Sequence, residues 1–303
     1  SRATRSLVVE KIVIGGPASQ ELAASMAKRM NARLVSPDVT EFADGETRIK
    51  FNEKVDGAKA ILVQSTHPPT DKHYMQLFQM AHYLSQEGSR VHAVIPYLGY
   101  ARQDKQFTAG EVVSLGVVSH MLRSVGVARV TTVDIHSAEG MSLFSVPIYS
   151  VSAIPNLVQY VKKNLNLTNA VVVAPDFGSS KRTEAFATLY GAKNIQLSKQ
   201  RDRTTGEVRV AEEELDVEGS DVIIVDDMIS TGGTVRAATE KLKKARARKV
   251  IAACVHALLV GGAQEKLAAA GVDEIIGTNT VPIRVSKVDA TEPLASYLRT
   301  LSE

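Results

Sequence analysis

The sequence predicts an α/β protein with two tandem domains, each a mostly parallel β-sheet flanked by helices. Its 303 residues exceed the ~100–200 residues of one typical domain. Short apolar runs rich in Val, Ile and Ala alternate with helical patterns from end to end, as in successive βαβ units. Similar strand-end motifs occur in both halves, which indicates a duplicated domain.

The predicted strands are apolar on both faces, which is typical of buried parallel strands. We expect them at 11–16, 59–65, 91–97, 130–136, 170–176, 222–227 and 249–258. Helical patterns lie between them at 20–31, 72–86, 112–125, 180–190 and 235–247.

Two pairs of motifs suggest how the halves correspond. VIPYLGYAR (94–102) is similar to VAPDFGSSKR (173–182), and VTTVDIHS (130–137) is similar to VIIVDDMIS (222–230). On this alignment the second half carries an inserted polar loop at 198–214, which we interpret as functional. The alternative is chance similarity between α/β strands.

The domain boundaries are predicted at 1–149 and 150–303. Ser152 is placed to cap a helix with Pro155 in its first turn. Thr291 and Pro293 begin a closing helix, and we allow for this helix to pack back on the first domain.

Composition limits the function classes. A net charge of +3 and the absence of Trp argue against nucleic-acid binding. No apolar run approaches the ~18–20 residues of a membrane span. The lone Cys254 lies in an apolar run and is expected to be buried, which fits a reducing cytoplasm. The basic run at 241–249 is either a solvated helix face or a surface for an anion or partner.

The most informative segment is VIIVDDMISTGGT (222–234). Here a strand ends in Asp226 and Asp227, and a Ser-Thr-Gly-Gly-Thr loop leads into a helix. Ligands bind beyond the carboxyl ends of parallel strands, and glycines with a helix N-terminus favour a phosphate. Carboxylates beside a phosphate need sugar hydroxyls or Mg²⁺ to face. The loop therefore predicts a site for a phosphorylated sugar.

This loop resembles the 5-phosphoribosyl 1-pyrophosphate (PRPP) loop of type I phosphoribosyltransferases and PRPP synthetases, the ribose-phosphate pyrophosphokinases. The rest of the chain resembles the synthetases, in TEFADGETRI (40–49), YLGYARQDK (97–105), TTVDIHSAEGMSLF (131–144), VAPDFGSSKR (173–182) and LSKQRD (197–202). The resemblance implies two tandem type I phosphoribosyltransferase-like domains.

The resemblance also implies the site residues. The ATP-binding residues are Phe42, Asp44, Gly45, Glu46, Arg102 and Gln103. His136 and Asp176 are expected at Mg²⁺, and Lys199 and Arg201 as catalytic cations. Ribose 5-phosphate is expected on Arg201, Asp226, Asp227, Ser230, Thr231, Gly232, Gly233 and Thr234.

The implied activity is a Mg²⁺-dependent transferase and kinase reaction of nucleotide biosynthesis. The β,γ-pyrophosphoryl group of ATP passes to the 1-hydroxyl of ribose 5-phosphate, which gives PRPP and AMP. The alternatives are a phosphoribosyltransferase that uses PRPP and a non-catalytic synthetase-associated regulator. A generic Rossmann protein is disfavoured because KIVIGGPAS (11–19) lacks the full glycine spacing.

One segment departs from the usual family pattern. After Asp104 the chain continues KQFTAGEVVSL (105–115), which is shorter and less basic than in bacterial and mammalian members and is similar to archaeal ones. The longer version binds regulatory nucleotide and phosphate, so that control is not implied here. The resemblance implies a cytoplasmic homo-oligomer and leaves dimer, tetramer and hexamer open.

Overall fold

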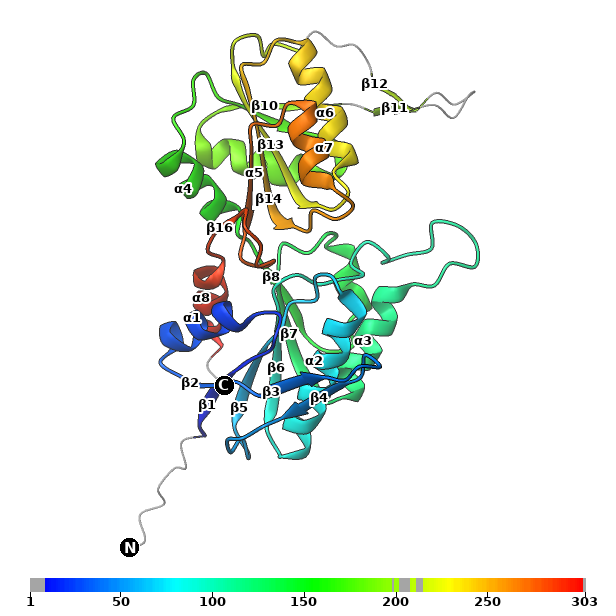
Figure 1. The fold of residues 1–303 in the computed structure, drawn as a ribbon, viewed down its shortest axis with the longest axis vertical. Helices are drawn as coiled ribbons and strands as arrows, with labels where there is room; N and C mark the ends of the chain where they lie inside the picture. Colours follow the sequence, from blue (N-terminus) through cyan, green and yellow to red (C-terminus); the bar gives the residue numbers. More distant parts are fainter. Residues whose placement is uncertain (1–8, 198, 202–207, 211–214, 302–303) are drawn as a thin grey trace, which may run out of the picture. The chain divides into compact units, whose positions relative to one another are not determined.

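A computed structural model describes residues 9–197, 199–201, 208–210 and 215–301 (Figure 1). The chain divides into two compact units. Unit 1 comprises Ser1–Val151 and Thr291–Glu303, and unit 2 comprises Ser152–Ala290. Among the residues that the structure describes, no helix has the length and apolar character needed to cross a bilayer.

Unit 1 is built on a six-stranded parallel sheet in the order β2-β1-β5-β6-β7-β8. Its strands are β1 (Lys11–Gly15), β2 (Arg33–Val35), β5 (Lys59–Val63), β6 (Arg90–Ile95), β7 (Val127–Val133) and β8 (Ile148–Val151). A separate antiparallel hairpin consists of β3 (Asp38–Glu41) and β4 (Thr47–Lys50). The helices are α1 (Gln20–Met30), α2 (Thr70–Gln86), α3 (Ser114–Ser124), the 3₁₀ turn η1 (Glu139–Leu143) and α8 (Thr291–Thr300).

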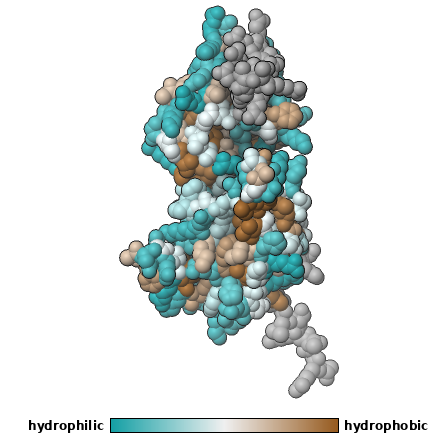
Figure 2. All heavy atoms as spheres, turned by 90° about the vertical axis from the view of Figure 1, so that its right-hand side faces the viewer, coloured by the Kyte–Doolittle hydropathy of each residue, from teal (hydrophilic) through white to brown (hydrophobic). Residues whose placement is uncertain are grey.

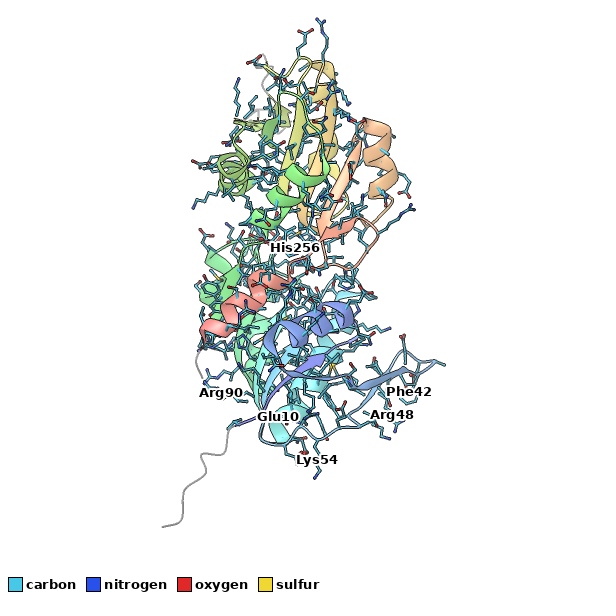
Figure 3. The ribbon with its side chains drawn as sticks, turned by 90° about the vertical axis from the view of Figure 1, so that its left-hand side faces the viewer. Glu10, Phe42, Arg48, Lys54, Arg90 and His256 are labelled. Atoms are coloured by element: carbon cyan, nitrogen blue, oxygen red, sulfur yellow. The ribbon has the colours of Figure 1, made fainter. Side chains whose placement is uncertain are left out.

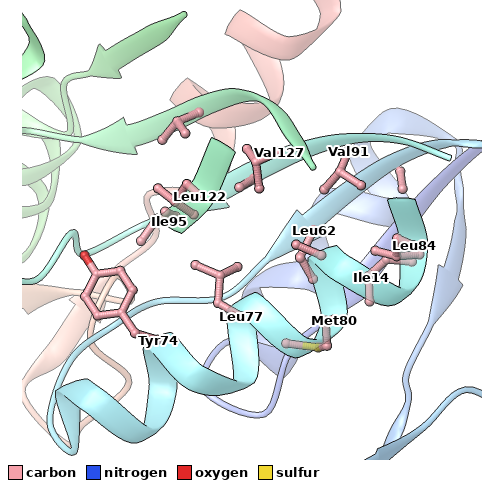
Figure 4. Close-up of a cluster of buried hydrophobic side chains, with 14 of the residues drawn as sticks. Ile14, Leu62, Tyr74, Leu77, Met80, Leu84, Val91, Ile95, Leu122 and Val127 are labelled. Atoms are coloured by element: carbon pink, nitrogen blue, oxygen red, sulfur yellow. The ribbon is translucent and has the colours of Figure 1, made fainter. Parts of the chain in front are cut away.

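The core of unit 1 lies between the sheet and helices α2 and α3 (Figure 4). Tyr74, Leu77, Met80 and Leu84 recur at helical spacing along α2, so they form one buried stripe. They pack against strand residues such as Leu62. Truncating a fully buried Leu such as Leu77 to Ala would cost about 2–5 kcal/mol of folding free energy.

The closing helix α8 belongs to unit 1, where it packs against α1. Arg29 of α1 pairs with Glu292 at 2.6 Å, and the rings of Tyr149 and Tyr297 stack with centroids 4.0 Å apart. Unit 2 begins with a helix that Ser152 helps to cap, because its hydroxyl accepts a hydrogen bond from the Ile154 amide at 3.2 Å.

Unit 2 contains a second six-stranded parallel sheet in the order β10-β9-β13-β14-β15-β16. Its strands are β9 (Val171–Ala174), β10 (Lys193–Gln196), β13 (Asp221–Ile229), β14 (Lys249–Ala257), β15 (Glu274–Thr278) and β16 (Ser286–Val288). The antiparallel pair β11 (Lys199–Arg201) and β12 (Val208–Val210) is separate. The helices are α4 (Ile154–Asn164), η2 (Phe177–Ser179), α5 (Ser180–Tyr190), α6 (Gly233–Lys244) and α7 (Ala263–Ala270).

The two sheets share one topology, since each places its strands, counted along the chain, in the order 2-1-3-4-5-6. The motif alignment proposed from the sequence is wrong. VIPYLGYAR begins in β6, the fourth sheet strand of unit 1, whereas VAPDFGSSKR begins in β9, the first sheet strand of unit 2. Likewise, β7 is a fifth strand and β13 a third. The motifs look alike because strand ends at the same edge of parallel sheets carry similar loops.

The shared topology also contradicts the prediction that the polar loop at 198–214 is an insertion. Residues 36–58 connect the second and third sheet strands of unit 1, and residues 197–220 make the same connection in unit 2. Each connection contains an antiparallel strand pair, β3–β4 or β11–β12. The polar segment of the second half is therefore the counterpart of the first-half hairpin and not an insertion.

Cys254 and the basic run of α6 have structural roles. Cys254 is fully buried in β14, as expected, and burial raises the pKa of its thiol. Lys243 pairs with Asp273 at 3.4 Å and Arg246 with Glu218 at 2.9 Å. These pairs support the helix-face interpretation for Lys243 and Arg246, whereas the Lys241 ammonium is buried without a hydrogen-bond partner among the described residues.

Candidate active site

Asp226 and Asp227 of unit 2 lie on β13, the third sheet strand along the chain, which is paired with β9 and β14. The sequence predicts that this strand ends at the acids, but it continues through Ile229 because Met228 and Ile229 pair with β14. Asp226 is half-buried and Asp227 is 3% exposed. The Asp227 amide donates to Asp226 Oδ1 at 2.8 Å, which fixes the Asp226 carboxylate near the end of the strand.

The loop after β13 has the geometry of an anion cradle. Ser230 O accepts the Val260 amide at 3.0 Å, which anchors the start of the loop. Gly232 is the N-cap of α6 in the left-handed region, with φ 81° and ψ 7°. A Cβ at Gly232 would lie 3.2–3.3 Å from Leu267 side-chain atoms. The left-handed backbone and the lack of room for a Cβ both favour glycine here. The first amides of α6 have no partner within the helix and can bind an anion.

Asp176 brings a third carboxylate to the same edge of the unit 2 sheet. It follows β9, the neighbour of β13, and caps η2 by accepting the Ser179 amide at 3.2 Å. Burial raises the pKa of Asp226 well above its usual value, and the charges of Asp227 and Asp176 raise it further. Three mutually repelling carboxylates favour a cation or sugar hydroxyls at this edge.

Carboxylate oxygens of this kind suit Mg²⁺, which prefers oxygen ligands and retains waters. Within the described ranges, however, no group of three or more His, Cys, Asp or Glu side chains is arranged as a complete metal site. The acids of unit 2 therefore fit an ion that is completed by ligands from substrate or water.

In unit 1, the β3–β4 hairpin presents the predicted adenine-site residues. Its turn is closed by the Phe42 amide donating to Glu46 O at 2.8 Å and by the Glu46 amide donating to Asp44 Oδ1 at 3.1 Å. Gly45 has φ 90° at the tip. Phe42 is 46% exposed at the far end of the hairpin (Figure 3), where it is accessible to a ligand.

Two contacts fix the hairpin on α2. The Lys72 ammonium pairs with Glu41, the last residue of β3. Gln79 Nε2 donates to Thr47 O at 3.1 Å, at the first residue of β4. Both ends of the turn that carries Asp44 and Glu46 are thus held by one helix.

Arg102 and Gln103 line a cavity of about 730 Å³ in unit 1. The other lining residues are Pro69, Thr70, Asp71, Lys72, Tyr97, Gly99 and Tyr100. Arg102 is exposed, whereas Gln103 Oε1 accepts the Ser114 hydroxyl at 2.6 Å, which links it to the start of α3. Lys72 of α2 lines this cavity and also pairs with Glu41 of the hairpin. It therefore connects the two predicted ATP-binding elements.

Two residues at this cavity, Lys72 and Tyr100, were not predicted from the sequence. Tyr100 donates to Asp71 across the same cavity. A detectable feature was that Asp71 and Lys72 lie in the first turn of a helix that follows a strand end, at the edge where the other candidates gather.

The shortened segment after Asp104 is closed on itself. The Glu111 carboxylate accepts the Phe107 amide at 2.8 Å and the Thr108 hydroxyl at 2.8 Å. Phe107, Val112, Val117 and Met121 are all exposed in this loop and on α3. The face that carries the loop is turned toward the viewer in Figure 2, where apolar side chains lie among polar ones.

The remaining candidates are placed by their backbones. His136 is exposed three residues beyond β7, after Asp134, which has φ 40°. Lys199 and Arg201 lie on β11, paired with Val210 and Val208 of β12. His136 belongs to unit 1 and Asp176 to unit 2, so each is described within its own unit.

Comparison with known proteins identifies both parts of the chain. Residues 11–126 match the family model of the N-terminal domain of ribose phosphate pyrophosphokinase. Residues 150–289 match that of the phosphoribosyl transferase domain.

Similarity also extends over nearly the whole chain. Ribose-phosphate pyrophosphokinase from Sulfolobus acidocaldarius is 38% identical over 94% of this chain and 99% of the relative. The Pasteurella multocida enzyme of that name is 38% identical over 88% and 86%. A crystal structure of phosphoribosylpyrophosphate synthetase from Mycobacterium smegmatis aligns with a TM-score of 0.85 at 31% identity, covering 96% of this chain and 98% of that one. The chain belongs to the ribose-phosphate pyrophosphokinase family.

Proposed function

We propose that the chain transfers the β,γ-pyrophosphoryl group of Mg-ATP to the 1-hydroxyl of ribose 5-phosphate. The bond from O1 of the sugar to the β-phosphorus forms, the bond from the β-phosphorus to the α,β-bridging oxygen breaks, and AMP leaves with that oxygen. The hydroxyl proton is released. The observation that carries the proposal is the phosphate cradle of unit 2 beside three carboxylates, in a chain of this family.

The sugar phosphate is assigned to unit 2. The 5-phosphate would lie on the Ser230–Thr234 loop, where the Gly232 conformation and the start of α6 supply amides. Asp226 would accept hydrogen bonds from the ribose hydroxyls, since its carboxylate is the more exposed of the adjacent pair. Asp227 supports it from the buried side.

The nucleotide is assigned to unit 1. Phe42 offers an exposed ring for the base, and Asp44 and Glu46 offer acceptors for an amino or hydroxyl group. Arg102 lies on the large cavity and would hold phosphate oxygens. Lys72 would keep the hairpin next to that cavity.

Mg²⁺ would neutralise charge on the transferring group when it is bound. Asp176 and Asp226 are the residues of unit 2 that would hold it, because their repulsion is relieved by a cation. His136 is proposed to act on phosphate oxygens or through water. Lys199 and Arg201 are proposed as cations that stabilise the transferring group.

The direct test mixes the protein with ribose 5-phosphate, ATP and Mg²⁺. The expected result is equimolar AMP and PRPP, measured by chromatography, with none formed when Mg²⁺ is chelated. Release of ADP, or no product at all, would contradict the proposal.

Two alternatives predict other outcomes. A phosphoribosyltransferase would release pyrophosphate from PRPP when a nucleobase is added, without ATP. A non-catalytic regulator would bind both ligands without turnover, and Lys199→Ala would change nothing. Loss of turnover in Lys199→Ala with retained ribose 5-phosphate binding would support catalysis.

We also propose that the chain forms a homo-oligomer. The exposed apolar side chains of α3 and the preceding loop support this, because such groups gain from burial against a second copy. Sedimentation velocity on the wild type and on Val117→Asp tests it: a species of one chain for the wild type would contradict the assignment.

A further inference from the structure

A second concave site lies at the opposite end of the unit 1 sheet from the candidate active site. It is a cavity of about 70 Å³ at the amino ends of β1, β5, β6 and β7. Lys11, Lys59, Arg90 and Arg129 line it, together with His92. Its apolar lining comes from Met30, Ala60, Ile61, Val91, Ala128, Leu298 and Leu301.

The strand register explains why the cations converge. Lys11 is the register partner of Lys59, and Lys59 is the register partner of Arg90. In-register residues of parallel strands point to the same face, and neighbouring strands lie about 4.8 Å apart. His92, two residues beyond Arg90, is paired with Arg129 and extends the set on that face.

These four cations differ from their neighbour Arg33. Arg33, on the neighbouring edge strand, is bonded to Glu10 at 2.7 Å and to Glu53 at 3.0 Å. By contrast, no ion pair or side-chain hydrogen bond joins Lys11, Lys59, Arg90 or Arg129 to a residue within the described ranges. Like charges this close repel, and the half-buried position of Lys59 and Arg129 limits screening by water.

At the same edge of its sheet, unit 2 has a carboxylate that pairs with a cation. Its third and fourth sheet strands begin with Asp221 and Lys249, at the positions that Lys59 and Arg90 hold in unit 1. The buried Asp221 carboxylate is bonded to Arg248 at 2.8 Å and to the Thr168 amide at 2.7 Å. Unit 1 has a lysine where unit 2 has this acid.

His92, which lines the cavity, is uncharged there. Burial, then Arg129 and Arg90, lower the pKa of His92 to about 3, so its ring is neutral and hydrogen-bonded to Thr131 Oγ1 at 2.7 Å. A water needs roughly 10–15 Å³ of such space, so the cavity holds about five waters. That room suits one small anion and not a nucleotide.

We propose that this cavity, defined by Lys11, Lys59, Arg90 and Arg129, binds a small tetrahedral oxyanion such as inorganic phosphate. The anion takes the place that the Asp221 carboxylate holds in unit 2. The site is separate from the sugar-phosphate loop, which belongs to the other unit, and from the nucleotide cavity, which shares no residue with it.

The test uses the full chain with ¹³C-labelled histidine and follows the His92 ring signal, assigned with His92→Gln. Because phosphate also has access to the active site, only the His92 signal reports on this cavity. Titration with inorganic phosphate against sodium chloride of equal ionic strength should give a saturable shift with phosphate alone. Lys59→Gln/Arg90→Gln should weaken the binding at least tenfold, whereas Lys28→Gln, which removes an exposed α1 charge, should leave it unchanged.

A stability measurement keeps the test decisive if a variant is poorly folded. In chloride, the double variant should unfold at a higher temperature than the wild type, because two repelling charges are gone. In phosphate the order should reverse. Equal His92 shifts in both salts, an unchanged affinity in the double variant, or destabilisation in chloride would each overturn the proposal.

Discussion

The two units place very different groups after the same strand of the same topology. In unit 2 the third sheet strand, β13, leads into a loop with Gly232 in the left-handed region and the start of α6 open to a ligand. In unit 1 the third sheet strand, β5, leads into Gln64, Ser65 and Thr66, all fully buried.

Backbone groups of unit 1 are bonded by these side chains. Ser65 Oγ accepts the Tyr97 amide at 3.0 Å, and Thr66 Oγ1 accepts the Gly99 amide at 2.8 Å. Gln64 Oε1 accepts the Ala18 amide at 3.0 Å. The same topology can therefore carry either an open glycine loop that suits an anion or a loop held by buried polar side chains. A few residues at the carboxyl edge of the sheet decide which.

The largest expected effect comes from closing the open loop. Gly232→Ala adds a Cβ 3.2–3.3 Å from Leu267 at a φ of 81°. Loss of charge-assisted hydrogen bonds to the phosphate, worth about 1.5–3 kcal/mol, predicts roughly a ten- to hundredfold lower kcat/KM for ribose 5-phosphate. Steady-state kinetics measure it.

The matched control is Gly219→Ala, at φ 68° in a turn of the same unit with no atom within 4 Å of the added Cβ. It carries the backbone strain without the loop, so kcat/KM should stay near the wild-type value. Equal losses in both variants would mean that strain in unit 2, not the cradle, governs activity.

The second effect concerns the acid cluster, which unit 1 lacks after β5. Because burial and neighbouring acids raise the pKa of Asp226, its ionised form destabilises the folded state near neutral pH. Asp226→Asn should therefore stabilise the protein at pH 7, because the uncharged amide removes the repulsion from Asp227 and Asp176. Its activity should fall sharply.

The sign gives a pH window. The raised pKa means that the wild type has its full stability below the ordinary carboxyl pKa and loses it as pH rises through the shifted value. The advantage of Asp226→Asn in urea unfolding should shrink from pH 7 toward pH 4. Asp216→Asn, an exposed acid of unit 2, serves as control. An Asp226→Asn variant less stable at pH 7 would contradict the repulsion.

The third effect concerns the buried polar side chains that follow β5 in unit 1. Ser65→Ala leaves the buried Tyr97 amide without this acceptor, at a cost of about 1–3 kcal/mol in unfolding free energy. The change should not create a phosphate site, because no glycine-capped helix start follows. Ser142→Ala, which removes an exposed hydroxyl bonded to Glu139 O, should cost far less. A new phosphate-binding signal in Ser65→Ala would break the comparison.

The sequence predicted the alternating apolar strands and amphipathic helices because these patterns are local. It did not predict the short polar strands, such as Lys193–Gln196 at a sheet edge and Asp38–Glu41 in the hairpin, because few of their side chains are buried. It also misaligned the halves, since strand order depends on pairing between distant segments. The glycine loop after Asp227 was visible because its conformation restricts residue type.

The smallest effect separates the two hairpins. In unit 1, Lys72 pairs with Glu41 and holds the turn that carries Asp44, and both side chains are partly exposed, at 34% and 50%. An exposed pair contributes about 0.2–1 kcal/mol, so Lys72→Gln should raise KM for ATP roughly two- to threefold.

The kinetic pattern distinguishes positioning from general damage. KM for ribose 5-phosphate and kcat should stay unchanged in Lys72→Gln, because the contact lies only on the nucleotide side. Lys72→Arg should restore KM for ATP. High salt screens the ion pair, so it should raise KM for ATP of the wild type toward that of Lys72→Gln. Lys50→Gln removes another exposed charge from the same hairpin, one that forms no ion pair with a described residue, and serves as the control. If kcat falls and KM does not move, Lys72 acts on the chemical step, and the hairpin is held by Gln79 and its own turn.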